Sequence, residues 1–205
     1  MSFLGKLFSE KREAKSNSTH VYIVSGLPRS GTSMMMKMLA AGGLPILTDS
    51  LREADEDNPN GYFEVELSKA LKEGEKKWIY NANGKIVKVI SYLLEFLPDD
   101  ITCDIIFMER DIREILASQK KMLQRRNESL AISDAEMESQ FREHLRAVKY
   151  WLARKPGFRV LYVNYNEMMK NPEKLCRSVK SFLDLPLDLE AMQAIPNQSL
   201  YRNRS

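Results

Sequence analysis

The sequence GLPRSGTS, from Gly26 to Ser33, has the residue types of a loop that binds an anion. It follows the apolar run VYIV and precedes an apolar helical pattern, so it joins a buried strand to the N-terminus of a helix. Backbone N–H groups at such an N-terminus point toward the loop and bind phosphate or similar anions.

The loop departs from the nucleotide-binding pattern G-x-x-x-x-G-K-[ST] at its lysine. Gly26 and Gly31 have the spacing of that pattern and Ser33 closes it, but Thr32 stands where the lysine belongs. That lysine reaches the β- and γ-phosphates of a nucleoside triphosphate, so the loop lacks this cation. Arg29 places another cation inside the loop, and its guanidinium fork suits one terminal anionic group. The residues favour a ligand with a single 5′-phosphate and one more acidic group.

GLPRSGTS resembles the 5′-phosphosulfate loop of the sulfotransferases. The likeness is greatest to bacterial-type members and the tyrosylprotein branch, which carry arginine where the cytosolic enzymes carry lysine. The resemblance runs from Val21 to about Leu185 and implies the donor 3′-phosphoadenosine 5′-phosphosulfate (PAPS), without a metal. It implies that the donor is bound by Pro28, Arg29, Ser30, Gly31, Thr32 and Ser33.

The run FMERDIREILASQ carries the second part of the resemblance. In sulfotransferases an arginine just after a strand and a serine eight residues later hold the 3′-phosphate of the donor, and Arg110 and Ser118 have this spacing. A guanidinium and a hydroxyl suit a dianionic phosphate. Taken alone, Arg110 is equally compatible with a surface salt bridge, and Ser118 with a small helix residue.

Two further segments complete the match to the donor site. LYVNYNEMMKNP resembles the family segment that would bring Tyr165 near the adenine, although a packing role for this tyrosine fits the sequence equally well. The C-terminal YRNR offers Arg202 or Arg204 to the 3′-phosphate, with a solvated tail as the alternative.

Sulfonyl transfer needs positive charge at the moving group and a base for the acceptor hydroxyl. Arg29 meets the first need by its position, and Lys88 in KIVKVIS resembles the second cation of the family, with an ordinary exposed lysine as the alternative. The cytosolic enzymes use a histidine between the two motifs as the base. This chain has only His20 and His144, and neither lies between Arg29 and Arg110.

The base is therefore expected to be a carboxylate, as in the tyrosylprotein and heparan branches, where a glutamate follows the loop cation. The acidic segment 48–62 supplies candidates, and we favour Asp55 or Glu53. The surplus of negative charge there would raise the pKa of one carboxyl toward working pH. Asp49, Asp57 and Glu64 are further candidates in or near this window.

Strand and helix patterns alternate along the chain and would position these groups. Strand patterns lie at 21–24, 85–89, 104–108 and 158–163, with a short strand or extended segment at 44–47. Helical patterns follow Gly31 and lie at 64–77, 91–97, 112–123, 133–152 and 172–183. This order predicts an α/β protein with a three-layer P-loop fold, in which a parallel sheet is flanked by helices. Ligands bind beyond the carboxyl ends of such strands, where Ser25 and Arg110 would lie.

Length and composition set further expectations. The 205 residues suit a single sulfotransferase-like α/β domain over 19–205, after a polar, amphipathic N-terminal tail over 1–18 that would fray or dock. The net charge of +3, with both signs spread along the chain, is not typical of nucleic-acid binding. Cys103 and Cys176 are expected to be buried free thiols, which favours a reducing compartment. No apolar run approaches the roughly 18 residues of a membrane span, so we expect a cytoplasmic protein.

The leading hypothesis is a PAPS-dependent sulfotransferase that acts on a hydroxyl or amine of a small-molecule, carbohydrate or peptide acceptor. One alternative is a nucleotide-dependent phosphotransferase with a degenerate phosphate loop, and another is a non-catalytic nucleotide-binding module. The identity of the acceptor and the oligomeric state do not follow from the sequence.

Overall fold

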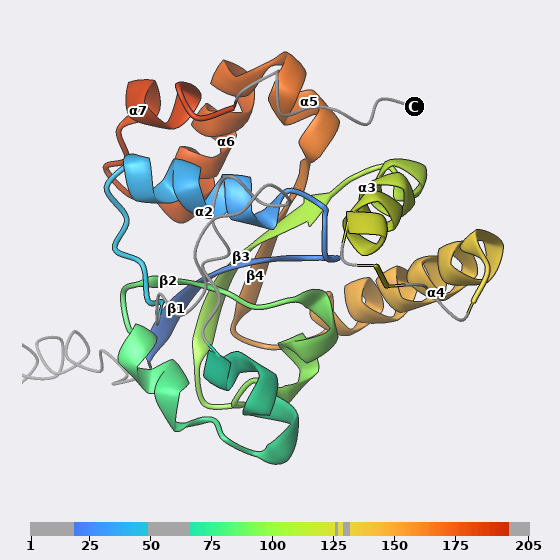
Figure 1. The fold of residues 1–205 in the computed structure, drawn as a ribbon. Coiled ribbons are helices and arrows are strands. Elements are labelled where there is room, and N and C mark those ends of the chain that lie inside the picture. The colour runs from blue at the N-terminus through green and yellow to red at the C-terminus, as the bar shows by residue number, and fades with distance from the viewer. Residues whose placement is uncertain (1–18, 49–65, 126, 129–131, 197–205) are drawn as a thin grey trace, which may run out of the picture.

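Four parallel strands form the central sheet, in the order β2-β1-β3-β4 (Figure 1). The computed structural model describes residues 19–48, 66–125, 127–128 and 132–196. The strands are β1 (His20–Gly26), β2 (Ile86–Lys88), β3 (Thr102–Glu109) and β4 (Phe158–Asn164). The order places β1 and β3 in the middle of the sheet, where their apolar side chains are buried from both faces. All four strands agree with the strand patterns of the sequence.

Helices cover both faces of this sheet and give the expected three layers (Figure 1). The α-helices are α2 (Thr32–Ala41), α3 (Ile112–Arg125), α4 (Asp134–Leu152), α5 (Tyr165–Lys170), α6 (Pro172–Leu183) and α7 (Leu189–Gln193). Three 3₁₀ helices, η1 (Glu66–Glu73), η2 (Lys77–Ala82) and η3 (Ser91–Phe96), lie between β1 and β3 in the sequence.

Successive side chains of the central strands enter two different parts of the core, as the alternation along a strand requires. Val21, Ile23 and Phe107 pack with the 3₁₀ helices and α4, whereas Val24 and Ile106 pack with α2, α6 and α7. Both cysteines are free and fully buried, as the sequence predicts. The α/β class and the parallel, helix-covered sheet are therefore confirmed.

Local signals mark the helix boundaries in two places. Ser133 caps α4 in a capping box with Glu136, and Asn171 caps α6 ahead of Pro172 at its first turn. Other segments differ from expectation in type. The described part of the pattern at 64–77 forms the 3₁₀ helix η1, and the pattern at 91–97 forms the 3₁₀ helix η3. Helices of the 3₁₀ type occur mostly as such short pieces. The segment 44–47 makes only an isolated bridge from Ile46 to Ile86.

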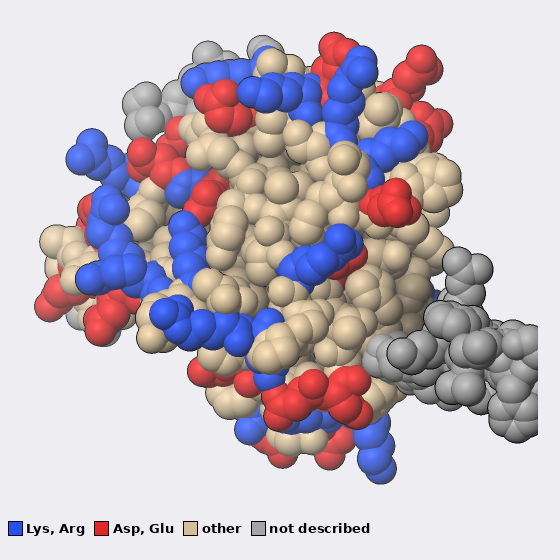
Figure 2. Space-filling model, turned by 180° about the vertical axis from the view of Figure 1, so that it is seen from behind, with Lys and Arg blue, Asp and Glu red and all other residues tan. Residues whose placement is uncertain are grey.

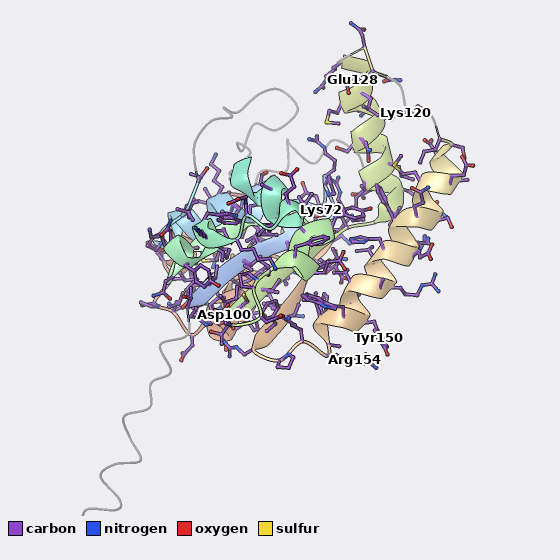
Figure 3. The ribbon with its side chains drawn as sticks, turned by 90° about the horizontal axis from the view of Figure 1, so that it is seen from below. Lys72, Asp100, Lys120, Glu128, Tyr150 and Arg154 are labelled. Carbon is purple, nitrogen blue, oxygen red and sulfur yellow. The ribbon has the colours of Figure 1, made fainter. Side chains whose placement is uncertain are left out.

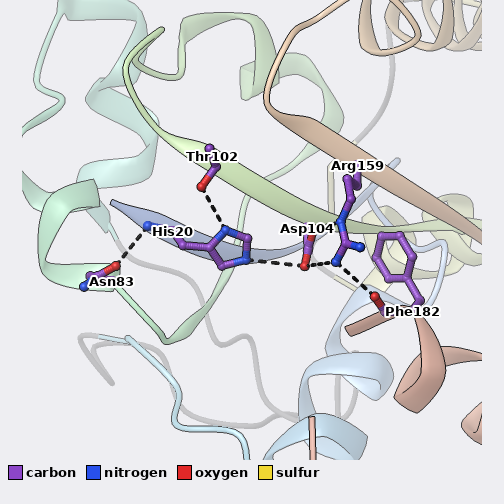
Figure 4. Close-up of polar contacts among 6 residues, drawn as sticks. All are labelled: His20, Asn83, Thr102, Asp104, Arg159 and Phe182. Carbon is purple, nitrogen blue, oxygen red and sulfur yellow. Dashed lines mark hydrogen bonds and ion pairs between the residues drawn. The ribbon is translucent and has the colours of Figure 1, made fainter. Parts of the chain in front are cut away.

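A polar cluster ties together the N-terminal ends of three strands (Figure 4). Asp104 on β3 is buried, and its two oxygens accept hydrogen bonds from Nε (2.6 Å) and Nη2 (2.5 Å) of Arg159 on β4. His20 on β1 places Nε2 at 3.3 Å from Asp104 and Nδ1 at 2.9 Å from the Thr102 hydroxyl. Burial acts to raise the pKa of Asp104, but the hydrogen bonds from His20 and Arg159 outweigh it and lower that pKa below its usual value.

The outer surfaces are of mixed charge. Seen from behind, basic and acidic side chains surround a broad area of uncharged residues (Figure 2). At one side of the sheet α3 and α4 lie against each other, with Lys120 toward the far end of α3 and Tyr150 and Arg154 near the end of α4 (Figure 3). No helix of the described residues is long and apolar enough to span a membrane.

Candidate functional site

The loop between β1 and α2 holds a backbone shape suited to an anion. Gly31 at the N-cap has φ of 101°, and Arg29 has φ of 70°, a left-handed conformation that is rare outside glycine. Within the described residues no side chain caps α2. The first N–H groups of the helix therefore face the loop, as an anion site requires.

Residues of β3 and α5 lie in close contact with this loop. A Cβ atom at Gly31 would lie 2.4 Å from Cδ2 of Tyr165, the first residue of α5. A Cβ atom at Gly26 would lie 2.6 Å from the carbonyl oxygen of Met108 on β3. Both glycines are thus required by packing as well as by their positive φ, and the loop is fixed between β3 and α5.

The two motifs that are predicted to bind anions meet directly. Nε of Arg29 donates a hydrogen bond of 3.0 Å to Oγ of Ser118, which lies in the second turn of α3. Nη1 of Arg110 donates a bond of 3.2 Å to the backbone carbonyl of Arg29. Because the Ser118 hydroxyl accepts from Arg29, its own proton is directed to another acceptor. The structure therefore brings Arg29, Arg110 and Ser118 together.

A buried carboxylate, which the sequence reasoning missed, supports Arg110. Glu114 accepts a hydrogen bond of 2.8 Å from Nε of Arg110 and another of 2.8 Å from Nδ2 of Asn166 on α5. The Arg110 guanidinium also lies over the ring of Tyr165, 4.3 Å from the centroid. The spacing of four residues between Arg110, just before α3, and Glu114, in its first turn, was the available signal.

Tyr165 is a buried residue in this arrangement. Its side chain packs on Gly31 and against Arg110, and only 6% of the residue is exposed. These contacts show the packing role that the sequence allowed. A contact with adenine stays a prediction.

Lys88 is buried rather than exposed, so the reading of an ordinary surface lysine is wrong. Its Nζ donates a hydrogen bond of 3.2 Å to Oγ of Ser33, at the start of α2, and 6% of the residue is exposed. Lys88 closes β2, next to the strand that leads into the loop. This ammonium group therefore reaches the loop helix from a neighbouring strand, in the part of the site where Thr32 leaves the loop without its lysine.

The remaining expected residues divide into two groups. Pro28 is exposed on the loop, and Ser30 and Thr32 are buried in it. The candidate bases Asp49, Glu53, Asp55, Asp57 and Glu64, and the arginines Arg202 and Arg204, lie outside the described residues. The N-terminal tail over 1–18 lies outside them as well.

The two histidines lie on β1 and α4. His20 begins β1, so the length of that strand, about 20 Å, separates it from the loop. His144 stacks on Tyr92 and forms a hydrogen bond of 2.8 Å with the Ser91 hydroxyl. Burial lowers the pKa of His144 below its ordinary value.

A cavity of about 430 Å³ lies beside the loop, between the end of β3 and helices α3 and α4. Leu27 and Ser30 line it from the loop, and Arg110 and Arg113 from the start of α3. The Ser30 hydroxyl is buried and has no hydrogen-bond partner among the described residues. A polar ligand would supply one. The described residues contain no group of three or more metal-ligating side chains.

Comparisons with known proteins agree with this geometry. A sulfotransferase from Mycobacterium tuberculosis matches with a TM-score of 0.54 at 17% identity, over 94% of this chain and 74% of that chain. The sulfotransferase domain from the curacin biosynthetic pathway matches with a TM-score of 0.50 at 13% identity, over 86% of this chain and 77% of that chain. At these identities the likeness shows the fold. A comparison with curated proteins found no match.

The sequence model of the sulfotransferase family matches residues 55–189, about two thirds of the chain. This range includes Lys88, Arg110, Ser118 and Tyr165 and begins after the phosphate loop. The match covers more than half of the chain and therefore shows the family. The chain belongs to the sulfotransferase family.

Proposed function

We propose that the protein transfers a sulfonyl group from PAPS to a hydroxyl or amine acceptor. The supporting observation is the direct contact between the loop and α3, through Arg29, Ser118 and Arg110. PAPS carries one anionic group at the 5′ position and another at the 3′ position, so it needs two anion-binding groups at a fixed separation. The uncapped N-terminus of α2 and the Arg110–Ser118 pair suit these two anions.

The described residues would have separate roles in binding the donor and in the reaction. The α2 amides and Arg29 would hold the 5′-phosphosulfate, and Arg110 and Ser118 the 3′-phosphate. Lys88 would add positive charge near Ser33, where charge develops on the leaving phosphate. In the reaction the acceptor oxygen or nitrogen bonds to sulfur as the bond from sulfur to the bridging oxygen breaks, and that oxygen leaves with the electron pair.

The base that takes the acceptor proton is proposed to be Asp55 or Glu53. Support comes from the sequence alone: neither histidine lies between Arg29 and Arg110, and the acidic segment follows Arg29 at the spacing of the carboxylate-using branches. The closer kinship to the arginine-loop, tyrosylprotein-like branch is proposed on the same ground. The acceptor is proposed to be a small molecule, carbohydrate or peptide, and the buried free thiols suit a reducing compartment such as the cytoplasm.

Calorimetry with 3′-phosphoadenosine 5′-phosphate (PAP), the desulfated product, tests the donor. We expect binding without Mg²⁺ and transfer of label from PAPS to an accepted hydroxyl compound. The double variant Glu53→Gln/Asp55→Asn should bind PAP and fail to transfer. Absence of PAP binding, or Mg²⁺-dependent ATP binding in its place, would contradict the proposal and favour a phosphotransferase.

Ser118→Ala gives a narrower prediction. Loss of a charge-assisted hydrogen bond should weaken PAP binding by about 1 to 2 kcal/mol, measured by calorimetry. Ser178→Ala is a matched control, because Ser178 is also on a helix but lies exposed on α6, where it bonds to the Lys174 carbonyl. Unchanged PAP affinity in Ser118→Ala would remove Ser118 from the donor site.

A further inference from the structure

Burying the carboxylate of Glu114 costs desolvation free energy, and the carboxylate has a specific set of contacts. Its side chain is 1% exposed, and a charge so far from water is tolerated only when it is paired and hydrogen-bonded. Both of its oxygens are used: Oε2 accepts from Arg110, and Oε1 accepts from Asn166. Glu114 therefore connects the start of α3 to α5 across the base of the site.

Other glutamate–arginine pairs in the chain show how unusual this one is. Glu173 and Arg177 on α6 have the same spacing of four residues and a separation of 2.5 Å, but their side chains are 60% and 67% exposed. Such a surface pair contributes little and fixes neither side chain. The Arg110 side chain is 8% exposed, so its partner restricts its geometry much more strongly.

Three contacts among the described residues restrain the orientation of the Arg110 guanidinium. Glu114 accepts a hydrogen bond from Nε, and the Arg29 carbonyl accepts one from Nη1. The Tyr165 ring covers one face of the guanidinium. A guanidinium has five N–H donors in a rigid plane, so fixing the Nε edge and one face determines where the Nη end points. Nη1 lies at the loop, where it donates to the Arg29 carbonyl, and Arg29 in turn donates to Ser118.

We propose that Glu114 is a positioning residue, which orients Arg110 so that its Nη end binds the 3′-phosphate of the donor. The proposal rests on the proposed function, since it assigns Arg110 to that phosphate. It gives Asn166 a supporting part, because the Asn166 amide holds the second carboxylate oxygen. Glu114 acts through Arg110 and need not touch the nucleotide.

The test compares PAP with AMP, which lacks the 3′-phosphate, by calorimetry on wild type and Glu114→Gln. Glutamine keeps the size of the side chain and removes its charge. We expect the affinity for PAP to fall about tenfold in Glu114→Gln and the affinity for AMP to stay within twofold. Asn166→Ala, which leaves the Arg110 contact in place, should lower PAP affinity by a smaller factor, about threefold. Glu173→Gln is the matched control and should change neither affinity.

The outcomes separate the two proposals. A wild-type protein with no preference for PAP over AMP would overturn the donor assignment, and the positioning role with it. A clear wild-type preference that survives in Glu114→Gln would overturn the positioning role alone. Equal losses for PAP and AMP would show a merely structural effect and overturn it too. If Glu114→Gln does not fold, Asn166→Ala decides, since an unchanged PAP preference there contradicts the network.

Discussion

At the scale of the residue, Gly31 shows how closely the loop is fitted to its surroundings. Its φ of 101° disfavours any side chain, and a Cβ atom there would meet Tyr165 at 2.4 Å. Gly43 has almost the same φ, 97°, but a Cβ atom there would meet nothing within 4 Å. The two glycines therefore separate the cost of the backbone from the cost of the contact.

Gly31→Ala is expected to lower the free energy of unfolding by about 2 to 4 kcal/mol, from backbone strain together with the clash. Gly43→Ala should lose only about 1 kcal/mol, from strain alone. Urea denaturation of both variants gives the difference. Equal losses would mean that the Tyr165 ring moves aside at no cost.

At the scale of the element, the Asp104 cluster joins the N-terminal ends of β1, β3 and β4, at the opposite end of the sheet from the loop (Figure 4). Nη2 of Arg159 also donates a hydrogen bond of 3.1 Å to the backbone carbonyl of Phe182 on α6. The cluster therefore belongs to the stability of the sheet rather than to the chemistry of the loop.

Asp104→Asn should destabilise the protein by about 1.5 to 3 kcal/mol at pH 7, through lost hydrogen bonds to a charged group. The native pKa of Asp104 is lowered, so its contribution is present above the unfolded pKa and is lost as pH falls through the native value. The gap between wild type and variant in urea denaturation should thus shrink toward pH 3. Asp99→Asn is the control, because Asp99 is exposed, pairs with Lys155 and should have little effect. A gap that is constant with pH would contradict this account.

At the scale of the whole molecule, the two buried thiols make the stability of the protein depend on pH in the alkaline range. Burial raises the pKa of Cys103 to about 12 and that of Cys176 to about 11, from ordinary values of 9.0. The native state thus keeps protons that the unfolded chain releases. Their contribution to stability is fully present below pH 9 and is lost as pH rises from there toward the native values.

The free energy of unfolding should therefore fall between pH 8 and pH 10.5, by at most about 1.4 kcal/mol per pH unit for each thiol above pH 9. The variant Cys103→Ala/Cys176→Ala, although less stable at pH 8, should show a shallower decline in urea denaturation over the same range. The tyrosines Tyr22, Tyr92 and Tyr162, whose pKa values burial also raises, remain in both proteins. Parallel declines would show that the thiols do not contribute.

Local signals in the sequence were enough to predict the strands, most helices and the loop. The apolar run before Gly26, the capping residues Ser133 and Asn171, and the period of the apolar positions each act over a few residues. The type of the short helices was missed, because a six-residue run has too few turns to distinguish 3₁₀ from α-helix. The short helix α5 was not predicted, because six residues are too few to show a clear helical period.

The sequence by itself determined the pattern of the phosphate loop, its departure at Thr32, and the α/β class. Only the tertiary structure decided how they meet. Arg29 and Ser118 are 89 positions apart, and Lys88 and Ser33 are 55 apart, so no local pattern reports their contacts. The environment of Glu114 was hidden as well, since one of its carboxylate oxygens accepts from Asn166, 52 positions away. Such contacts follow from the order and register of the strands, which are fixed by packing of the entire sheet.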